Sequence, residues 1–263
     1  MKGFLLSLQS EFYKSRKTLG FWSPIILPLI ITFLVFLGFF LKSEKFVHDP
    51  PMMLWLKFSS IPIGIMGSLL LPMFVVFIAY SVNSIEHKAD TWKMLFTLPI
   101  SKWAIYSAKF VYTAFLVLMC MMLFATFTIG WANLLAAMKP ELKFGAFHME
   151  KELYLLYFKL FLASLGIVSL QFLLSLLWKD FLKPMGIGFV GTIAGVILSG
   201  TVKWEYAYLI PFSQPLLAIM GTGKPHQAKV GVDLLTKEVS ASLIIAIAIF
   251  IIGYFIVQRK SVK

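Results

Sequence analysis

Six long runs without a charged residue constrain the fold of this chain more than any other feature. They cover residues 19–41, 59–84, 110–138, 160–178, 185–202 and 239–258. About 20 apolar residues in a helix cross the hydrocarbon core of a bilayer, and only helices and closed barrels satisfy their backbone polar groups there. The runs lack the alternating, ~10-residue pattern of an outer-membrane barrel. We therefore predict an all-α integral membrane protein with six transmembrane helices.

The composition favours one membrane domain. Charged residues make up 14% of the chain and hydrophobic residues 59%, whereas a soluble domain carries about 25% charged residues. Because the six crossings use most of the chain, we expect residues 1–263 to form a single transmembrane domain. The formal net charge is +12, but the basic residues flank the apolar runs. That arrangement is typical of anchoring in a lipid membrane and not of a face that binds nucleic acid.

The first eighteen residues predict an amphipathic interfacial helix. Its apolar side and the basic residues that follow are formed by Phe4, Leu5, Leu8, Phe12, Lys14, Arg16 and Lys17. An apolar face with basic residues beside it is typical of helices that lie on a membrane surface. The run 19–41 is too long for the core of a signal peptide and has no small-residue cleavage site after it, so we interpret it as a retained first span.

The connection 203–238 is the longest stretch between two runs, and it is not uniformly polar. An apolar stretch, 208–220, lies within it and is interrupted by Pro211 and Pro215. About a dozen residues are too few to cross a bilayer. We predict a re-entrant element before the last span, within an extracytoplasmic loop; a surface loop with a hydrophobic cap is the alternative.

The distribution of lysine and arginine favours an orientation with both termini in the cytoplasm. This orientation places 13 of the 24 basic residues, with both arginines, on the shorter, cytoplasmic connections, where lysine and arginine are enriched. Only four of the 12 acidic residues fall on that side: Glu11, Glu86, Asp90 and Asp180. We expect a multi-pass protein of the inner (cytoplasmic) membrane.

The interiors of the six runs predict packing and not ion transport. None contains a charged residue, which argues against a proton- or ion-coupled carrier. Gly191 and Gly195 form a Gly-x-x-x-Gly pair that Ser199 extends. Small residues four apart allow another helix to approach closely, so we predict helix packing at these residues, with a substrate path as the alternative.

The connection between the second and third runs carries large apolar side chains where polar ones are expected. Asp90 is a suitable N-cap for a short helix that Pro99 ends, and Ser101 is a second cap for the helix that continues through Lys109 into the third run. The short helix would present Trp92, Leu95, Phe96 and Leu98. These side chains either dock into a pocket on a partner or lie on the lipid headgroups.

The segment from Glu86 to Lys109, EHKADTWKMLFTLPISKWAIYSAK, resembles the ABC-2 type transporter permeases, and most closely those of the lantibiotic (bacteriocin) immunity group. The residues that match the family pattern are Glu86, Thr91, Trp92, Lys93, Leu98, Pro99, Ser101, Lys102 and Lys109. Glu11 and Lys14 before the first span, the six spans and the re-entrant element also fit the family's layout.

The resemblance implies that residues 85–100 form a coupling helix that docks onto a separate cytoplasmic ABC ATPase. Two ATPase copies and a second permease copy or paralogue would complete the transporter, which would export an amphipathic substrate such as an antimicrobial peptide, a drug or a lipid. The residues that the resemblance assigns to ATPase docking are Glu86, Asp90, Thr91, Trp92, Leu95, Phe96, Leu98 and Pro99.

We expect no catalytic, cofactor or metal site on this chain, with ATP and Mg²⁺ bound by the partner ATPase. The only sequence near a phosphate-binding loop, Gly221-Thr222-Gly223-Lys224, is followed by Pro225 and has Ala218 where the first glycine belongs. A non-transporting membrane scaffold or assembly factor with a cytoplasmic docking loop is the alternative function. An integral-membrane enzyme would need polar residues converging at one membrane face, and the sequence shows no such group.

Overall fold

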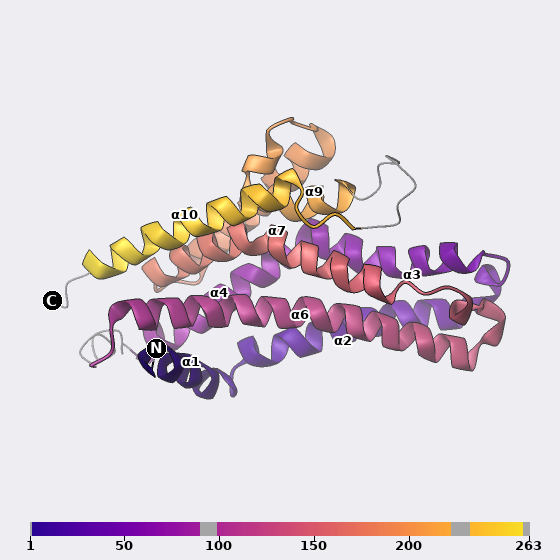
Figure 1. Cartoon of the computed structure of the whole chain (residues 1–263), viewed down its shortest axis with the longest axis horizontal. Helices are drawn as coiled ribbons and strands as arrows, with labels where there is room; N and C mark the ends of the chain where they lie inside the picture. Colours follow the sequence, from indigo (N-terminus) through magenta and orange to yellow (C-terminus); the bar gives the residue numbers. More distant parts are fainter. Residues whose placement is uncertain (1, 90–98, 222–231, 260–263) are drawn as a thin grey trace.

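The structure, a computed structural model, describes residues 2–89, 99–221 and 232–259, and these fold into helices with no strand among them (Figure 1). Within those residues, 6 helices are long and apolar enough to cross a membrane, as predicted. They are Leu19–Leu41, Pro51–Ala89, Lys102–Met138, Glu150–Leu177, Leu182–Thr201 and Lys237–Arg259.

The helices are joined mostly by short turns. Their bounds are α1 Lys2–Ser15, α2 Leu19–Leu41, α3 Pro51–Ile65, α4 Leu71–Ala89, α6 Lys102–Met138, α7 Glu150–Leu177, α8 Leu182–Val196, α9 Gln214–Met220 and α10 Lys237–Arg259. The π-helical segments η2 Met66–Leu70 and η5 Ile197–Thr201 continue α3 into α4 and extend α8. The 3-10 turns are η1 Ser43–Phe46, η3 Pro140–Leu142, η4 Phe144–Ala146, η6 Ala207–Leu209 and η7 Pro211–Ser213.

Both ends of the chain lie at the same end of the helix bundle, on the left in Figure 1. We call this the terminal end; it contains α1, the last turn of α4, the first turns of α6 and the last turns of α10. An even number of crossings requires this arrangement. The turns η1, η3 and η4 lie at the opposite end.

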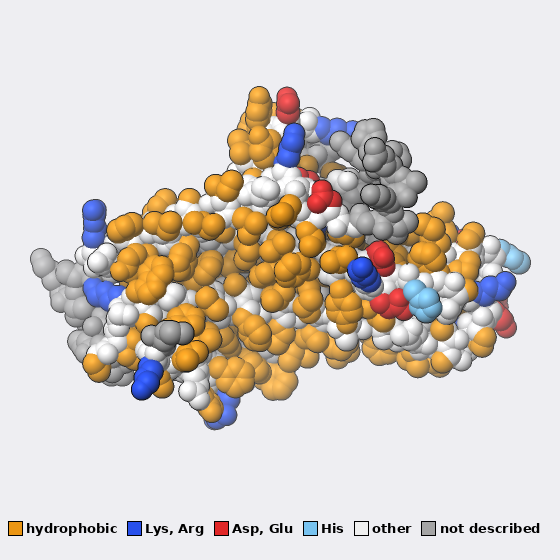
Figure 2. All heavy atoms as spheres, viewed as in Figure 1, with side chains coloured by type: hydrophobic (Ala, Val, Ile, Leu, Met, Phe, Trp, Pro, Cys, Tyr) orange, Lys and Arg blue, Asp and Glu red, His pale blue; other side chains and the backbone are white. Residues whose placement is uncertain are grey.

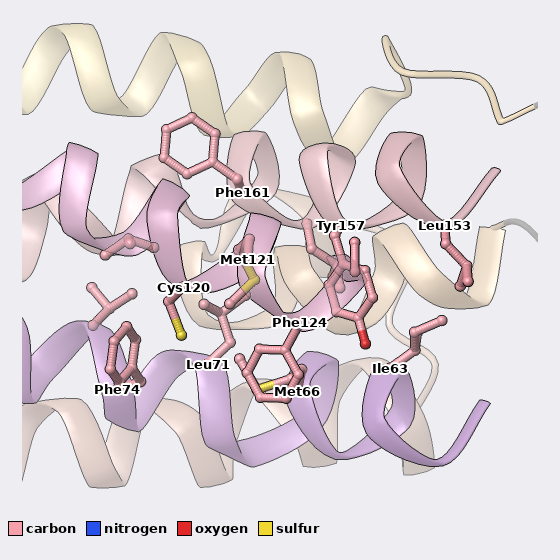
Figure 3. Close-up of a cluster of buried hydrophobic side chains, with 14 of the residues drawn as sticks. Ile63, Met66, Leu71, Phe74, Cys120, Met121, Phe124, Leu153, Tyr157 and Phe161 are labelled. Atoms are coloured by element: carbon pink, nitrogen blue, oxygen red, sulfur yellow. The ribbon is translucent and has the colours of Figure 1, made fainter. Parts of the chain in front are cut away.

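The core lies between the second span, α6 and α7. Figure 3 shows the side chains that meet there, among them Ile63, Met66, Leu71, Phe74, Cys120, Met121, Phe124, Tyr157 and Phe161. The rings of Phe124 and Tyr157 stack with centroids 5.8 Å apart. On the outside, hydrophobic side chains cover most of the middle of the visible face, while charged ones gather toward both ends and around the protruding connection between α8 and α10 (Figure 2). This surface suits lipid contact.

The second span is longer than the uncharged run 59–84. It continues through α3, η2 and α4 for 39 residues, so the helix starts about two turns earlier than the run and ends after it. Gly67 in the π-helical segment η2 packs directly against Ile219 of α9. A Cβ atom added at Gly67 would lie 1.8 Å from Cδ1 of Ile219. Only a residue without a Cβ atom allows so close an approach.

The connection before the last span turns back onto the bundle, as the predicted re-entrant element does. Its helices η6, η7 and α9 are short, and the structure does not describe residues 222–231 within it. Gly191 and Gly195 both pack closely against Phe212 of η7. A Cβ atom added at Gly191 would lie 2.5 Å from the Phe212 ring, and one added at Gly195 would lie 2.7 Å from the Phe212 backbone. The glycine pair therefore serves close packing, but against a 3-10 turn and not against a further spanning helix. Ser199 donates to the carbonyl oxygen of Gly195.

Candidate functional site

The terminal end holds the connection that the sequence assigned to partner docking. Residues 85–89, predicted to open this connection, instead form the last turn of α4. Six of the predicted docking residues lie outside the described residues: Asp90, Thr91, Trp92, Leu95, Phe96 and Leu98. Pro99 follows them and is exposed. The structure thus describes the two helices that flank the 90–98 connection: α4 precedes it and α6 follows it.

The side toward α6 begins at the predicted cap. Ser101 has extended backbone angles, and its Oγ accepts a hydrogen bond from the backbone N–H of Ala104 at 3.3 Å. This arrangement satisfies one of the free N–H groups of the first helical turn. The helix α6 then runs for 37 residues, about 55 Å at 1.5 Å per residue. It is longer than the membrane core, so its first turns reach out to the connection.

The side toward α4 is fixed by four charged side chains from three helices. Glu11 and Lys14 come from α1, Glu86 from α4 and Lys109 from α6. Lys109 Nζ lies 2.8 Å from Glu11 Oε2 and 2.6 Å from Glu86 Oε2. Lys14 Nζ lies 2.8 Å from Oε1 of both glutamates. Each carboxylate therefore bridges the same two ammonium groups, and we name these four residues the charge cluster.

The charge cluster has no net charge, and three of its four side chains are almost fully removed from water. The side chains of Lys109, Glu86 and Glu11 are 0%, 1% and 4% exposed. Lys109 also donates to the carbonyl oxygen of Val82 at 3.4 Å, so all three of its N–H groups have an acceptor. Burying charges is costly, and removing one member of a buried, hydrogen-bonded pair costs about 3–5 kcal/mol because its partner keeps an uncompensated charge.

Lys14 is the member of the charge cluster nearest to solvent. Its burial by itself would lower its pKa, but the neighbouring carboxylates of Glu11 and Glu86 outweigh that effect and raise the pKa above its ordinary value. A raised lysine pKa means that the pairing is present at and below neutral pH and is lost only when the pH rises through that pKa. Lys14 therefore stays charged at every physiological pH.

This geometry corrects the role predicted for Glu86. The resemblance placed Glu86 among the docking residues, yet its carboxylate points into the charge cluster and is 1% exposed. It is therefore not on a surface that a partner can touch, and it belongs to the support of the connection. The sequence pattern shows Glu86 at the start of a polar connection, and only the fold shows that α4 turns it inward.

The inward face of α1 makes contacts that the predicted interfacial helix did not include. The apolar side chains of the predicted membrane face, such as Leu5 and Phe12, do lie outside, but the helix packs on α4 and α6 through Ser7, Glu11 and Ser15. Ser15 forms a short hydrogen bond with the hydroxyl of Tyr112, one turn beyond Lys109. The helix is thus fixed to the bundle by polar contacts on its inner face, and it is not held by lipid alone.

Polar contacts also join the end of α4 to α7. The Nδ2 atom of Asn83 donates to Oγ of Ser175 at 2.8 Å, and Ser175 donates to the carbonyl oxygen of Ala79 at 3.0 Å. His87 Nε2 lies 2.9 Å from the carbonyl oxygen of Ser175. The last turns of α4 are therefore held on one side by the charge cluster and on the other by α7.

The start of α6 is joined to α10 in a similar way. Tyr106 donates to the carbonyl oxygen of Phe250 at 3.0 Å, and Lys102 donates to that of Gln258 at 3.3 Å. The Tyr106 hydroxyl fits against Gly253, where an added Cβ atom would lie 2.3 Å from it. Both sides of the 90–98 connection are thus joined to other helices of the bundle.

Two lysines correct the expectation that no charged residue lies within the spans. Lys109 and Lys159 end uncharged runs in the sequence, but α6 and α7 continue past them, and both are buried. Lys109 is neutralised by the charge cluster. The ammonium of Lys159 makes no hydrogen bond or ion pair within the part of the chain that the structure describes. Uncharged runs therefore mark the minimum length of these helices and not their ends.

The sequence contained the four charged residues but not their association. Glu11, Lys14, Glu86 and Lys109 were each part of the family resemblance, and all four were placed at the same membrane face by charge distribution. These residues were not predicted to pair with one another. Two carboxylates beside apolar runs need cations at the same depth in the membrane. The spacing Ser7, Glu11, Ser15 on one helix face was a second usable signal.

Comparison with known proteins agrees with this layout. Residues 7–195 match the family model described as ABC-2 family transporter protein. The matched range begins within α1, ends within α8 and includes the whole charge cluster and the 90–98 connection. No curated protein and no solved structure matches the chain.

Proposed function

The chain belongs to the ABC-2 family of transporter proteins and is a multi-pass membrane subunit of an ABC transporter, and from this premise we propose that it couples ATP hydrolysis on a separate ABC ATPase to export of an amphipathic substrate. The chain itself performs no catalysis in this proposal; ATP and Mg²⁺ are bound by the partner. An antimicrobial peptide, a drug or a lipid is the expected cargo, and the resemblance to the lantibiotic immunity group favours a peptide.

One observation carries the proposal: the 90–98 connection is bracketed by helix ends that are each fixed to other helices. On one side Glu86 of α4 is paired with α1 and α6. On the other side Lys102 and Tyr106 of α6 bond to α10. A partner that displaces the connection therefore displaces α1, α4, α6 and α10 together. Packed elements move as units and do not deform continuously, which suits transmission of a rigid-body shift.

The docking contact is assigned to the apolar side chains of the connection. Trp92, Leu95 and Phe96 are large and lie between two polar helix ends in the sequence. Buried aromatic anchors typically dominate protein interfaces. Asp90, Thr91, Leu98 and Pro99 complete the expected docking segment, whereas Glu86 acts from inside the bundle.

The assembly contains two ATPase copies and a second permease, either an identical copy or a paralogue. Within the described residues, α8 with η5 and α10 bury the smallest shares of their apolar windows, 28% and 22%. Those helices therefore have the most apolar surface for lipid or for a second permease. The terminal end faces the cytoplasm in this proposal, so the protein resides in the inner membrane with both termini inside.

Transport and scaffolding are separated by the activity of the assembled complex. We would purify the complex through a tag on this chain, reconstitute it in liposomes, and measure ATP hydrolysis with amphipathic peptides and a fluorescent phospholipid present. Stimulated hydrolysis together with ATP-dependent movement of a probe across the bilayer supports the transporter. A complex that hydrolyses no ATP, or whose hydrolysis no probe changes, favours the non-transporting scaffold.

A further inference from the structure

A groove of about 580 Å³ runs between α1 and α6 at the terminal end. Its floor is apolar and is built by Leu8 and Phe12 of α1 and by Val111 and Phe115 of α6. Val111 and Phe115 are 42% and 50% exposed and lie one turn apart on the side of α6 that faces outward. The volume falls within the roughly 300–1,000 Å³ of small-molecule sites.

The rim of the groove is polar, and a basic side chain lies beside it. Gln9 and Tyr13 of α1 line it, and they precede Arg16 by about two turns and one turn. The guanidinium of Arg16 lies over the ring of Tyr13, 5.2 Å from its centroid. In the described part of the chain this guanidinium forms no hydrogen bond or ion pair, so its N–H groups are available. Arginine binds phosphate through two parallel hydrogen bonds.

No carboxylate of α1 competes with a ligand for the Arg16 guanidinium. Glu11 is the only acidic residue among residues 1–18, and both of its oxygens are bound to lysines of the charge cluster. The basic residues Arg16 and Lys17 at the end of α1 are both exposed. The groove thus has an apolar floor along a membrane helix, and the Arg16 guanidinium, which has no carboxylate partner in the described part of the chain, lies beside its polar rim at Tyr13.

We propose that this groove binds an anionic phospholipid of the leaflet at the terminal end. One acyl chain lies along Val111 and Phe115, and the phosphate binds Arg16 beside Tyr13. Attraction between basic residues and anionic lipids contributes about 1 kcal/mol per residue near the membrane surface. Tyr112 lines the same groove and bonds to Ser15, so the lipid contacts the packing of α1 beside the charge cluster.

Native mass spectrometry of the full-length chain, purified in detergent, tests this site. The protein is incubated with phosphatidylglycerol or with phosphatidylcholine of identical acyl chains, and the retained lipid is counted. We expect phosphatidylglycerol to be retained in preference. Arg16→Gln should weaken its retention about fivefold, the equivalent of ~1 kcal/mol. Lys17→Gln removes the same charge one residue away and should leave retention nearly unchanged.

A third variant distinguishes a site from general surface attraction. Val111→Trp fills the groove without altering any charge, and it should abolish preferential retention of phosphatidylglycerol at an unchanged thermal midpoint. Equal losses in Arg16→Gln and Lys17→Gln would overturn the proposal. Unchanged lipid retention in Val111→Trp would overturn it as well. If that variant keeps its lipid but no longer self-associates, the groove is a contact between two copies of the chain and not a lipid site. Where Val111→Trp does not fold, the comparison of the two charge variants decides.

Discussion

The Nζ atom of Lys109 lies 2.6 Å from Oε2 of Glu86, in a contact from which water is excluded. This ion pair joins α6 to α4 on the two sides of the 90–98 connection. The same ammonium reaches Glu11 of α1, so three helices meet at one buried cation. A force applied to the connection is therefore carried by this pair.

Replacing Lys109 with methionine tests how much the charge cluster stabilises the fold. Lys109→Met keeps a side chain of similar length but leaves Glu11 and Glu86 with Lys14 alone. We expect a loss of about 3–5 kcal/mol in the free energy of unfolding, seen as a lower thermal midpoint in detergent. Lys159→Met is the matched control, since the Lys159 ammonium forms no direct hydrogen bond or ion pair in the described part of the chain and only the more distant carboxylates of Glu238 and Asp233 attract it. It should leave stability unchanged or raise it, and equal losses in both variants would contradict the account.

A double-mutant cycle measures the link between α1 and α6 directly. Glu11→Gln and Lys109→Met each remove one partner of the 2.8 Å contact between them. Because each single substitution already removes the contact between these two residues, the second substitution cannot remove it again, and the losses should not add. We expect a coupling free energy of roughly 0.5–3 kcal/mol from thermal or denaturant unfolding of the four variants. Simple additivity would show that the two residues act independently.

The N-cap of α6 predicts a local effect beside the connection. Ser101→Ala removes the acceptor of the Ala104 N–H and should cost about 0.5–2 kcal/mol. Ser101→Asp supplies another acceptor and should retain stability. Hydrogen exchange at the first turn of α6 should accelerate in Ser101→Ala alone. Unchanged exchange there would mean that the hydroxyl does not hold the helix start.

The glycines of α8 predict which positions tolerate a methyl group. At Gly195 an added Cβ atom would lie 2.7 Å from the Phe212 backbone, whereas at Gly186 no atom lies within 4 Å. Gly195→Ala should therefore destabilise by about 1–3 kcal/mol through overpacking. Gly186→Ala, in the same helix, should be neutral or gain about 0.5–1 kcal/mol from helix propensity. The reverse order in thermal midpoints would place the contact with Phe212 in doubt.

The sequence predicted the parts of the fold that follow from lipid as a solvent. Six apolar runs gave six spanning helices, and Ser101 gave the start of α6, because backbone satisfaction and capping are local requirements. The start of α7 at Glu150, well before Lys159, was missed, since a charged residue ends an apolar run without ending a helix. Pro211 and Pro215 indicated short helices before the last span, but not that Phe212 would pack on Gly191 and Gly195.

The association of the charge cluster could not be read from the sequence. Glu11, Glu86 and Lys109 are separated by up to 98 positions, and their pairing depends on the depth at which α1 packs on α4 and α6. The family resemblance assigned Glu86 to docking, whereas the last turn of α4 directs it inward. Local patterns report which residues are polar; tertiary packing decides which of them meet.

The most direct test of the central claim is co-purification of an ABC ATPase with this chain from its native membrane. The variant is Trp92→Ala together with Phe96→Ala, and the control is Trp204→Ala, an exposed tryptophan in the connection after α8. The account predicts that the ATPase co-purifies with wild type and with the control, and that it is lost from the double variant at unchanged expression. Full retention by the double variant, or the absence of an ATPase from the wild-type sample, would contradict it.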